Sequence, residues 1–144
     1  MSVKSAVLVF IQFTSLLFFI ADRHLLAYNY LLGIQILGIV VAFWGISTIR
    51  KGRFNIQPEV KPNAQLITSG PFKYIRNPMY TGIILFFSVS VSTYFTVYRM
   101  VVLLVLITVL LLKIKSEEVF LTQKFGNAYS TYKAQTKRLV PFVY

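Results

Sequence analysis

Four long apolar stretches without an internal charge limit what this chain can fold into. They cover residues 5–21, 25–49, 78–98 and 100–112. A helix needs roughly 20 mostly apolar residues to cross a hydrocarbon core of about 30 Å. Charged residues make up only 13% of the 144 residues, about half the share found in soluble domains. The sequence therefore predicts an all-α integral membrane protein, a four-transmembrane-helix bundle.

The fourth stretch is too short to cross a bilayer by itself. Residues 100–112 would reach only about 20 Å as a helix. We expect this helix to continue past Lys113 to the acidic pair Glu117 and Glu118. Lys113 then lies about one turn inside the membrane boundary, where Glu117 is the expected partner because it follows four residues later.

The distribution of basic residues predicts the orientation. With four spans, Arg23 and Arg99 lie on one side of the membrane, and every other Lys and Arg lies on the opposite side. This asymmetry follows the positive-inside rule, so we expect a multi-pass protein of the cytoplasmic (inner) membrane with both termini in the cytoplasm. The net charge of +11 then faces anionic membrane lipids, and no nucleic-acid partner is expected.

Composition and organisation exclude further classes of protein. The chain has no cysteine and a single histidine, His24, so we expect no disulfide, no cysteine nucleophile and no metal site. We interpret 1–144 as one domain, in which 1–49 forms two scaffold spans. The connection over 50–77, with Pro58 and Pro62, is the expected cytoplasmic loop.

The segment before the third span has the composition of an anion-binding helix start. Gly70-Pro71 predicts a turn, and Asn77-Pro78 predicts an N-cap followed by proline at the first helical position. The free N–H groups of such a start, with Arg76 beside them, suit a small carboxylate or phosphate. A simple helix start with snorkelling cations accounts for the same spacing.

The segment after the fourth span combines acidic and aromatic residues. Glu117 and Glu118 point about 100° apart around a helix, so only one can face squarely into the bundle. The sequence leaves open which one does. Tyr129 and Tyr132 share one face of a predicted C-terminal amphipathic segment. They could pack on the bundle or stack on an aromatic ligand, and a solvated helix end remains an alternative for the whole segment.

Together, these two segments resemble the isoprenylcysteine carboxyl methyltransferases and the related phospholipid methyltransferases. Members of this family are integral membrane enzymes that use S-adenosylmethionine. Their signature is Arg-His-Pro-x-Tyr, a hydrophobic stretch and Glu-Glu, which stands here as Arg76-Asn77-Pro78-Met79-Tyr80 and Glu117-Glu118. The flanks Gly70-Pro71-Phe72-x-Tyr74, Phe125-Gly126-x-x-Tyr129-x-x-Tyr132 and Pro141-Phe142 also match. The resemblance covers 66–144, which we interpret as the cofactor region.

The resemblance implies an S-adenosylmethionine pocket at the cytoplasmic face. The residues expected to bind the cofactor are Tyr74, Asn77, Pro78, Met79, Tyr80, Glu117, Glu118, Tyr129 and Tyr132. The expected catalytic residues are Glu118, Glu117, Lys113 and Arg76. The implied acceptor is a lipophilic small molecule or prenylated substrate, such as an isoprenylcysteine carboxylate, a phospholipid or a prenyl or alkyl phenol.

Two positions differ from the family pattern. Asn77 replaces the usual histidine, which removes a possible general base, and Lys113 stands where the eukaryotic enzymes carry an arginine. Lysine lacks the bidentate fork that suits a carboxylate. A membrane reductase of the sterol-reductase type using NADPH, a small four-span transporter and a nonenzymatic scaffold are the alternative functions. The acceptor and the oligomeric state stay open.

Overall fold

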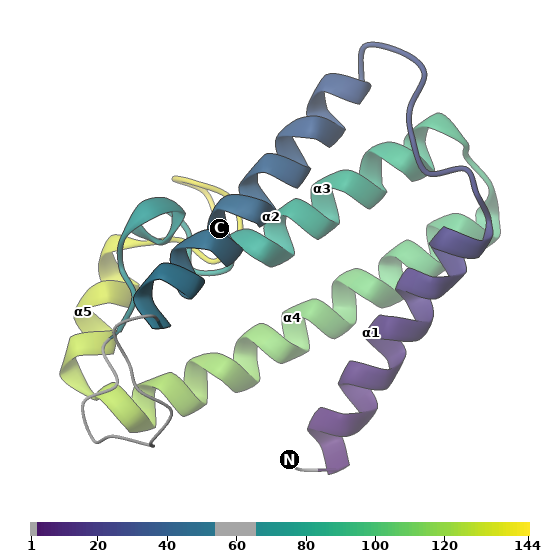
Figure 1. The fold of residues 1–144 in the computed structure, drawn as a ribbon. Helices are drawn as coiled ribbons and strands as arrows, with labels where there is room; N and C mark the ends of the chain where they lie inside the picture. The colour runs from purple at the N-terminus through teal and green to yellow at the C-terminus, as the bar shows by residue number, and fades with distance from the viewer. Residues whose placement is uncertain (1–2, 54–65) are drawn as a thin grey trace.

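The protein is a bundle of α-helices, seen here in a computed structural model that describes residues 3–53 and 66–144 (Figure 1). The helices are α1 Val3–Ala21, α2 Leu32–Arg53, α3 Pro78–Thr93, α4 Val97–Phe125 and α5 Asn127–Gln135, with a short 3₁₀ helix, η1, at Gly70–Lys73. No strand occurs in the described residues, and an isolated bridge joins Ile75 to Lys137. The predicted all-α class is confirmed. Pro58 and Pro62 of the expected loop lie outside the described residues.

Three helices are long and apolar enough to cross a membrane: α1, α2 and α4. The fourth apolar helix, α3, has 16 residues and extends over about 24 Å, less than the hydrocarbon thickness. The structure therefore supports an apolar bundle with three full-length candidate spans. That the chain crosses exactly four times stays a prediction.

Two helix boundaries differ from the sequence prediction. α2 begins at Leu32 rather than near residue 25, because Asn29 forms a turn in which its side-chain oxygen accepts a hydrogen bond from the Leu31 N–H at 3.0 Å. α3 ends at Thr93, because the chain leaves helical geometry at Tyr94 and re-enters it at Val97. Apolar residues thus continue through a turn that hydropathy alone does not reveal.

The predicted extension of the fourth helix is confirmed. α4 runs without interruption for 29 residues and ends before Gly126, whose φ of 52° is a left-handed conformation that suits glycine. At 1.5 Å per residue α4 is about 43 Å long, so it extends well beyond the thickness of a hydrocarbon core. Its last turns carry Glu117 and Glu118.

Small residues let α2 and α3 pack closely. A Cβ added to Gly82 in α3 would lie 2.7 Å from the Cβ of Ala42 in α2 and would also collide with the Gly38 carbonyl oxygen. A Cβ on Gly45 would lie 2.9 Å from Pro78. The two helices therefore approach each other closely at both of these points.

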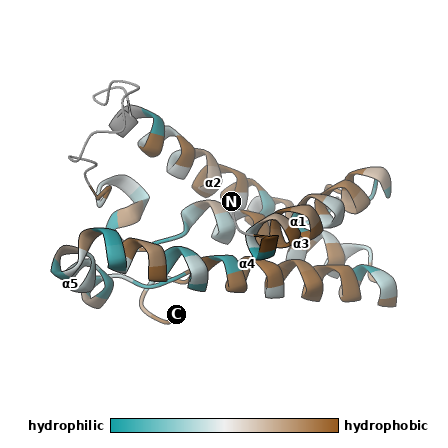
Figure 2. Ribbon diagram, turned by 90° about the horizontal axis from the view of Figure 1, so that it is seen from below, coloured by the Kyte–Doolittle hydropathy of each residue, from teal (hydrophilic) through white to brown (hydrophobic). Residues whose placement is uncertain are grey.

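The first helix packs mainly against α4 rather than against α2, the next helix in the chain. The extensive helix pairs are α2 with α3 and α1 with α4, and a smaller contact joins α3 to α4. A core of six buried apolar residues, Phe19, Phe87, Val91, Leu103, Leu106 and Leu110, connects α1, α3 and α4. Large apolar side chains are exposed along α1 and α2, and apolar residues dominate the long helices in Figure 2. Such surfaces are expected where helices face lipid.

A buried ion pair closes the end of the bundle away from α5. Arg99 is 1% exposed and forms an ion pair with Asp22. Its guanidinium also donates to the His24 carbonyl oxygen at 2.8 Å and to the Ser90 hydroxyl at 2.7 Å. The charge of Arg99 is therefore paired inside the protein rather than left in an apolar environment.

Candidate functional site

The start of α3 and the second half of α4 lie next to each other. The Tyr80 hydroxyl in α3 donates a hydrogen bond to Glu117 Oε1 in α4 at 2.8 Å. The Arg76 guanidinium, just before α3, forms an ion pair with Glu118 at 3.0 Å. The two segments that carry the sequence motif therefore meet at the α5 end of the bundle.

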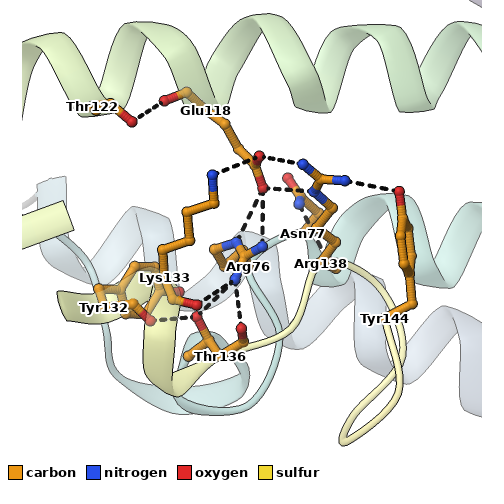
Figure 3. Close-up of polar contacts among 9 residues, drawn as sticks. All are labelled: Arg76, Asn77, Glu118, Thr122, Tyr132, Lys133, Thr136, Arg138 and Tyr144. Atoms are coloured by element: carbon orange, nitrogen blue, oxygen red, sulfur yellow. Dashed lines mark hydrogen bonds and ion pairs between the residues drawn. The ribbon is translucent and has the colours of Figure 1, made fainter. Parts of the chain in front are cut away.

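Glu118 is surrounded by cations (Figure 3). Its side chain is 7% exposed. Arg138 donates to both of its oxygens, at 3.0 Å and 2.8 Å, and Arg76 donates to Oε1 from two nitrogens at 3.2 Å and 3.0 Å. Lys133 Nζ lies 3.6 Å away. The carboxylate thus joins α4 to the segment before α3 and to the segment after α5.

Backbone hydrogen bonds reinforce this junction. The Arg76 N–H donates to the Lys137 carbonyl oxygen at 2.7 Å, and the Asn77 N–H donates to the Arg138 carbonyl oxygen at 3.1 Å. Arg138 also donates to the Tyr144 hydroxyl at 2.9 Å. The hydrogen bonds from Arg138 to Glu118 and then to Tyr144 raise the pKa of Arg138 above its usual value, so this cation stays charged.

A cavity of about 450 Å³ lies beside the junction. This volume falls in the range of small-molecule sites, roughly 300–1,000 Å³. Eight of the residues predicted from the sequence line it: Arg76, Asn77, Met79, Tyr80, Glu117, Glu118, Tyr129 and Tyr132. The remaining lining comes mainly from apolar residues of α2, α4 and the segment before η1, with one further cation, Lys124.

Three predicted site residues do not line this cavity. Tyr74 is half exposed. Pro78 is buried against Gly45 of α2. The Lys113 ammonium donates to Gln12 Oε1 at 2.7 Å and lies 5.3 Å from the centre of the Tyr80 ring.

The expected Lys113–Glu117 ion pair is absent from the described part of the chain, and this expectation was wrong. Glu117 accepts a hydrogen bond from Tyr80, while Lys113 extends toward Gln12 in α1. A helix spacing of four residues makes a pair possible but does not make it the best available. Partners from other helices are closer in this case.

Asn77 occupies the N-cap position of α3, as predicted. Its side chain makes no capping hydrogen bond, and its amide instead donates to the Arg138 carbonyl oxygen at 3.2 Å. The first turn of α3 therefore has no side-chain cap at the point where Met79 and Tyr80 border the cavity. Uncapped N–H groups at a helix start suit a carboxylate.

The two tyrosines of α5 form part of the cavity wall. Tyr129 is 1% exposed and Tyr132 is 7% exposed, and their ring centroids lie 6.0 Å apart. The Tyr132 hydroxyl donates to the Phe72 carbonyl oxygen at 2.7 Å. Burial raises the pKa of Tyr132 to about 12 and also raises that of Tyr129. Both phenols are therefore neutral near neutral pH.

Sequence reasoning missed three residues of this region: Gln12, Lys124 and Arg138. Arg138 and Lys124 looked like ordinary basic residues of the tail. Gln12 stood in a span interpreted as scaffold, although it shares a helical face with Ser15 and Phe19, which are also buried. The available sequence signal was an amide side chain inside an otherwise apolar span.

Comparison with known proteins gives one family. The family described as phospholipid methyltransferase matches residues 24–128. No curated protein and no solved structure matches the chain significantly.

Proposed function

Because the chain belongs to the phospholipid methyltransferase family, we propose that it transfers a methyl group from S-adenosylmethionine to a lipophilic acceptor at the cytoplasmic face of the inner membrane. The observation that carries this proposal is the cavity between the start of α3, the second half of α4 and α5. Its walls carry most of the residues that the family signature singles out.

The cavity fits the chemistry of an amino-acid nucleoside. The uncapped first turn of α3, near Asn77, Met79 and Tyr80, suits the methionyl carboxylate. The buried rings of Tyr129 and Tyr132 offer an aromatic wall for the adenine. The amino group and the ribose hydroxyls of the cofactor suit a carboxylate nearby.

Glu117 is the better candidate for that carboxylate. Both oxygens of Glu118 already accept hydrogen bonds from arginine. Glu117 is exposed, lines the cavity, and among the described residues accepts a hydrogen bond from Tyr80 alone. We therefore assign Glu117 to the cofactor and acceptor, and Glu118 to holding Arg76 and Arg138 in place.

The bound cofactor would supply a methyl group made electrophilic by the sulfonium charge. The protein's own part is to align the acceptor with that methyl group and to exclude water. An acceptor that is already an anion needs no base. For a phenol or an amine, Glu117 is the carboxylate at hand to accept the proton.

We also propose that α3 counts as the fourth span. Its neighbours α2 and α4 are both long enough to cross the membrane, and α3 packs against them. Four crossings place both termini and α5 on one side, and the positive-inside rule makes that side cytoplasmic.

The test is calorimetry with S-adenosylhomocysteine on the purified protein in detergent. We expect binding with a dissociation constant on the order of micromolar. Glu117→Gln should weaken it by about tenfold or more, since a hydrogen bond to a charged group is worth about 1.5–3 kcal/mol. Ser116→Ala, an exposed neighbour that does not line the cavity, is the matched control.

Two results would contradict the proposal. Binding of NADPH instead of S-adenosylhomocysteine would favour a reductase. Equal affinities in the wild type and in Glu117→Gln would remove Glu117 from the cofactor site.

A further inference from the structure

A polar contact between α1 and α4 lies outside the cofactor cavity. Gln12 of α1 is 8% exposed. Its side-chain oxygen accepts a hydrogen bond from Lys113 Nζ of α4 at 2.7 Å. Both residues stand in apolar helices that are long enough to cross a membrane, where polar groups are costly and are usually functional.

This contact has more hydrogen-bond donors than acceptors. An ammonium group has three donors and no acceptor, and a glutamine amide has two donors besides its oxygen. Gln12 uses its oxygen on Lys113, and the Lys113 charge lies over the face of the Tyr80 ring. Among the contacts of the described residues, neither an acidic partner for Lys113 nor an acceptor for the Gln12 amide is present. No carboxylate of the described residues therefore lies within ion-pair distance of Lys113, and Glu117 is linked to it only through the Tyr80 side chain.

The pair adjoins the cofactor cavity through Tyr80. One face of the Tyr80 ring lies toward Lys113, while the same side chain lines the cavity and donates to Glu117. Ile114, the residue after Lys113, also lines the cavity. On α1, Phe13 follows Gln12 and is 58% exposed, in a position to face lipid. The donors thus lie next to Tyr80 of the cavity wall, on helices that also carry an exposed apolar residue, Phe13.

We infer that Gln12 and Lys113 together bind an anionic oxygen of the methyl acceptor, and that α1 forms one wall of the acceptor site. This inference rests on the proposed methyltransferase function. The acceptor class is a lipophilic molecule with a carboxylate, phosphate or phenolate group. Such an oxygen supplies the acceptors and the negative charge that the pair lacks. α1 then contributes to specificity and is more than a scaffold.

The experiment compares two lipids with the same acyl chain, of which one has an ionised carboxylate and the other an uncharged methyl ester. Radiolabelled oleate and methyl oleate are bound to the full-length protein in detergent micelles, in the wild type and three variants. We expect the wild type to prefer oleate by about tenfold or more, the effect of a hydrogen bond to a charged group. Lys113→Met removes the charge, and Gln12→Glu neutralises it internally, so both should abolish the preference. Gln12→Glu keeps a partner for Lys113, which preserves the contact between α1 and α4.

Ser15→Ala is the matched control. Ser15 lies one turn along the same buried face of α1, and its hydroxyl bonds only within α1, to the Ile11 carbonyl oxygen at 2.9 Å. This variant should keep the oleate preference. Thermal denaturation of all variants in detergent confirms that the folded protein is being compared.

Three outcomes would overturn the inference. A wild type without a preference for oleate would show that the protein has no such anion site. An unchanged preference in folded Gln12→Glu would show that the contact between Gln12 and Lys113 is purely structural. Loss of S-adenosylhomocysteine binding together with the oleate preference would assign the pair to the cofactor. If the wild type binds no S-adenosylhomocysteine but still prefers oleate in a Lys113-dependent manner, the proposed function fails while the anion site stands.

Discussion

Replacing Glu118 with glutamine should release the segment 127–144 from the bundle without unfolding the long helices. Glu118 is the point where α4 holds Arg76, before α3, and Arg138, after α5. Glutamine keeps one oxygen acceptor but loses the negative charge. The two arginines then repel each other across a site that no longer compensates them.

The magnitude follows from burial. Removing one partner of a buried ion pair costs about 3–5 kcal/mol. The Arg76 side chain is 8% exposed but also donates to the carbonyl oxygens of Lys133 and Thr136, so the lower value applies. Arg138 is 32% exposed, and water can replace much of its lost partner. A cost of about 3 kcal/mol corresponds to more than a hundredfold change in a local opening equilibrium.

Amide hydrogen exchange measured by mass spectrometry reports this opening directly. In Glu118→Gln, peptides from 127–144 should exchange about a hundredfold faster, while peptides from α1 should keep their wild-type rates. Glu117→Gln is the matched control, because Glu117 forms no ion pair with a cation among the described residues. Unchanged exchange over 127–144 in Glu118→Gln would refute the reasoning that this carboxylate holds the segment.

Two further predictions concern packing and pH. Gly82→Ala places a Cβ 2.7 Å from the Cβ of Ala42, so it should separate α2 from α3 and lower the free energy of unfolding by about 1–3 kcal/mol. The midpoint of thermal denaturation in detergent should fall accordingly. Gly33→Ala is the control, because the space around its new Cβ is open, and it should leave the midpoint unchanged. Burial raises the pKa of Tyr132 from 10 to about 12. The neutral Tyr132 phenol should therefore contribute fully to the free energy of unfolding below pH 10, and this contribution should be lost as the pH rises through 12. A tyrosinate absorbance titration with circular dichroism checks this, and alkaline loss of helix that persists unaltered in Tyr132→Phe would contradict it.

Features that depend on neighbouring residues could be predicted from the sequence. The continuation of α4 past Lys113 followed from the length of helix needed to approach the thickness of a bilayer. The N-cap position of Asn77 followed from the proline after it. The contact between Tyr80 and Glu117, which are 37 residues apart, could be predicted for a different reason: the resemblance to a known family places these residues at one site, and the two side chains are hydrogen-bonded.

Features that depend on distant residues could not be predicted. The partners of Glu118 come from positions 20 and 42 residues away, and their choice depends on how α5 folds back. The partner of Lys113 comes from a position 101 residues away. Local spacing favoured Glu117, because an i,i+4 pair is visible in the sequence while a contact between helices is not. The turn at Asn29 was hidden by the apolar residues on both sides of it.

The pairing of α1 with α4 and of α2 with α3 has a consequence for biosynthesis. Translation delivers α1 and α2 to the membrane first, yet the principal partner of each is made later. Both must remain in lipid as separate helices until the second half of the chain arrives, since helices insert before they associate. The hydrogen bond between Gln12 and Lys113 forms late, because Lys113 lies near the end of the last long apolar helix to be synthesised. A chain truncated before α4 therefore leaves α1 without its principal partner. We expect membrane quality control to recognise such a chain.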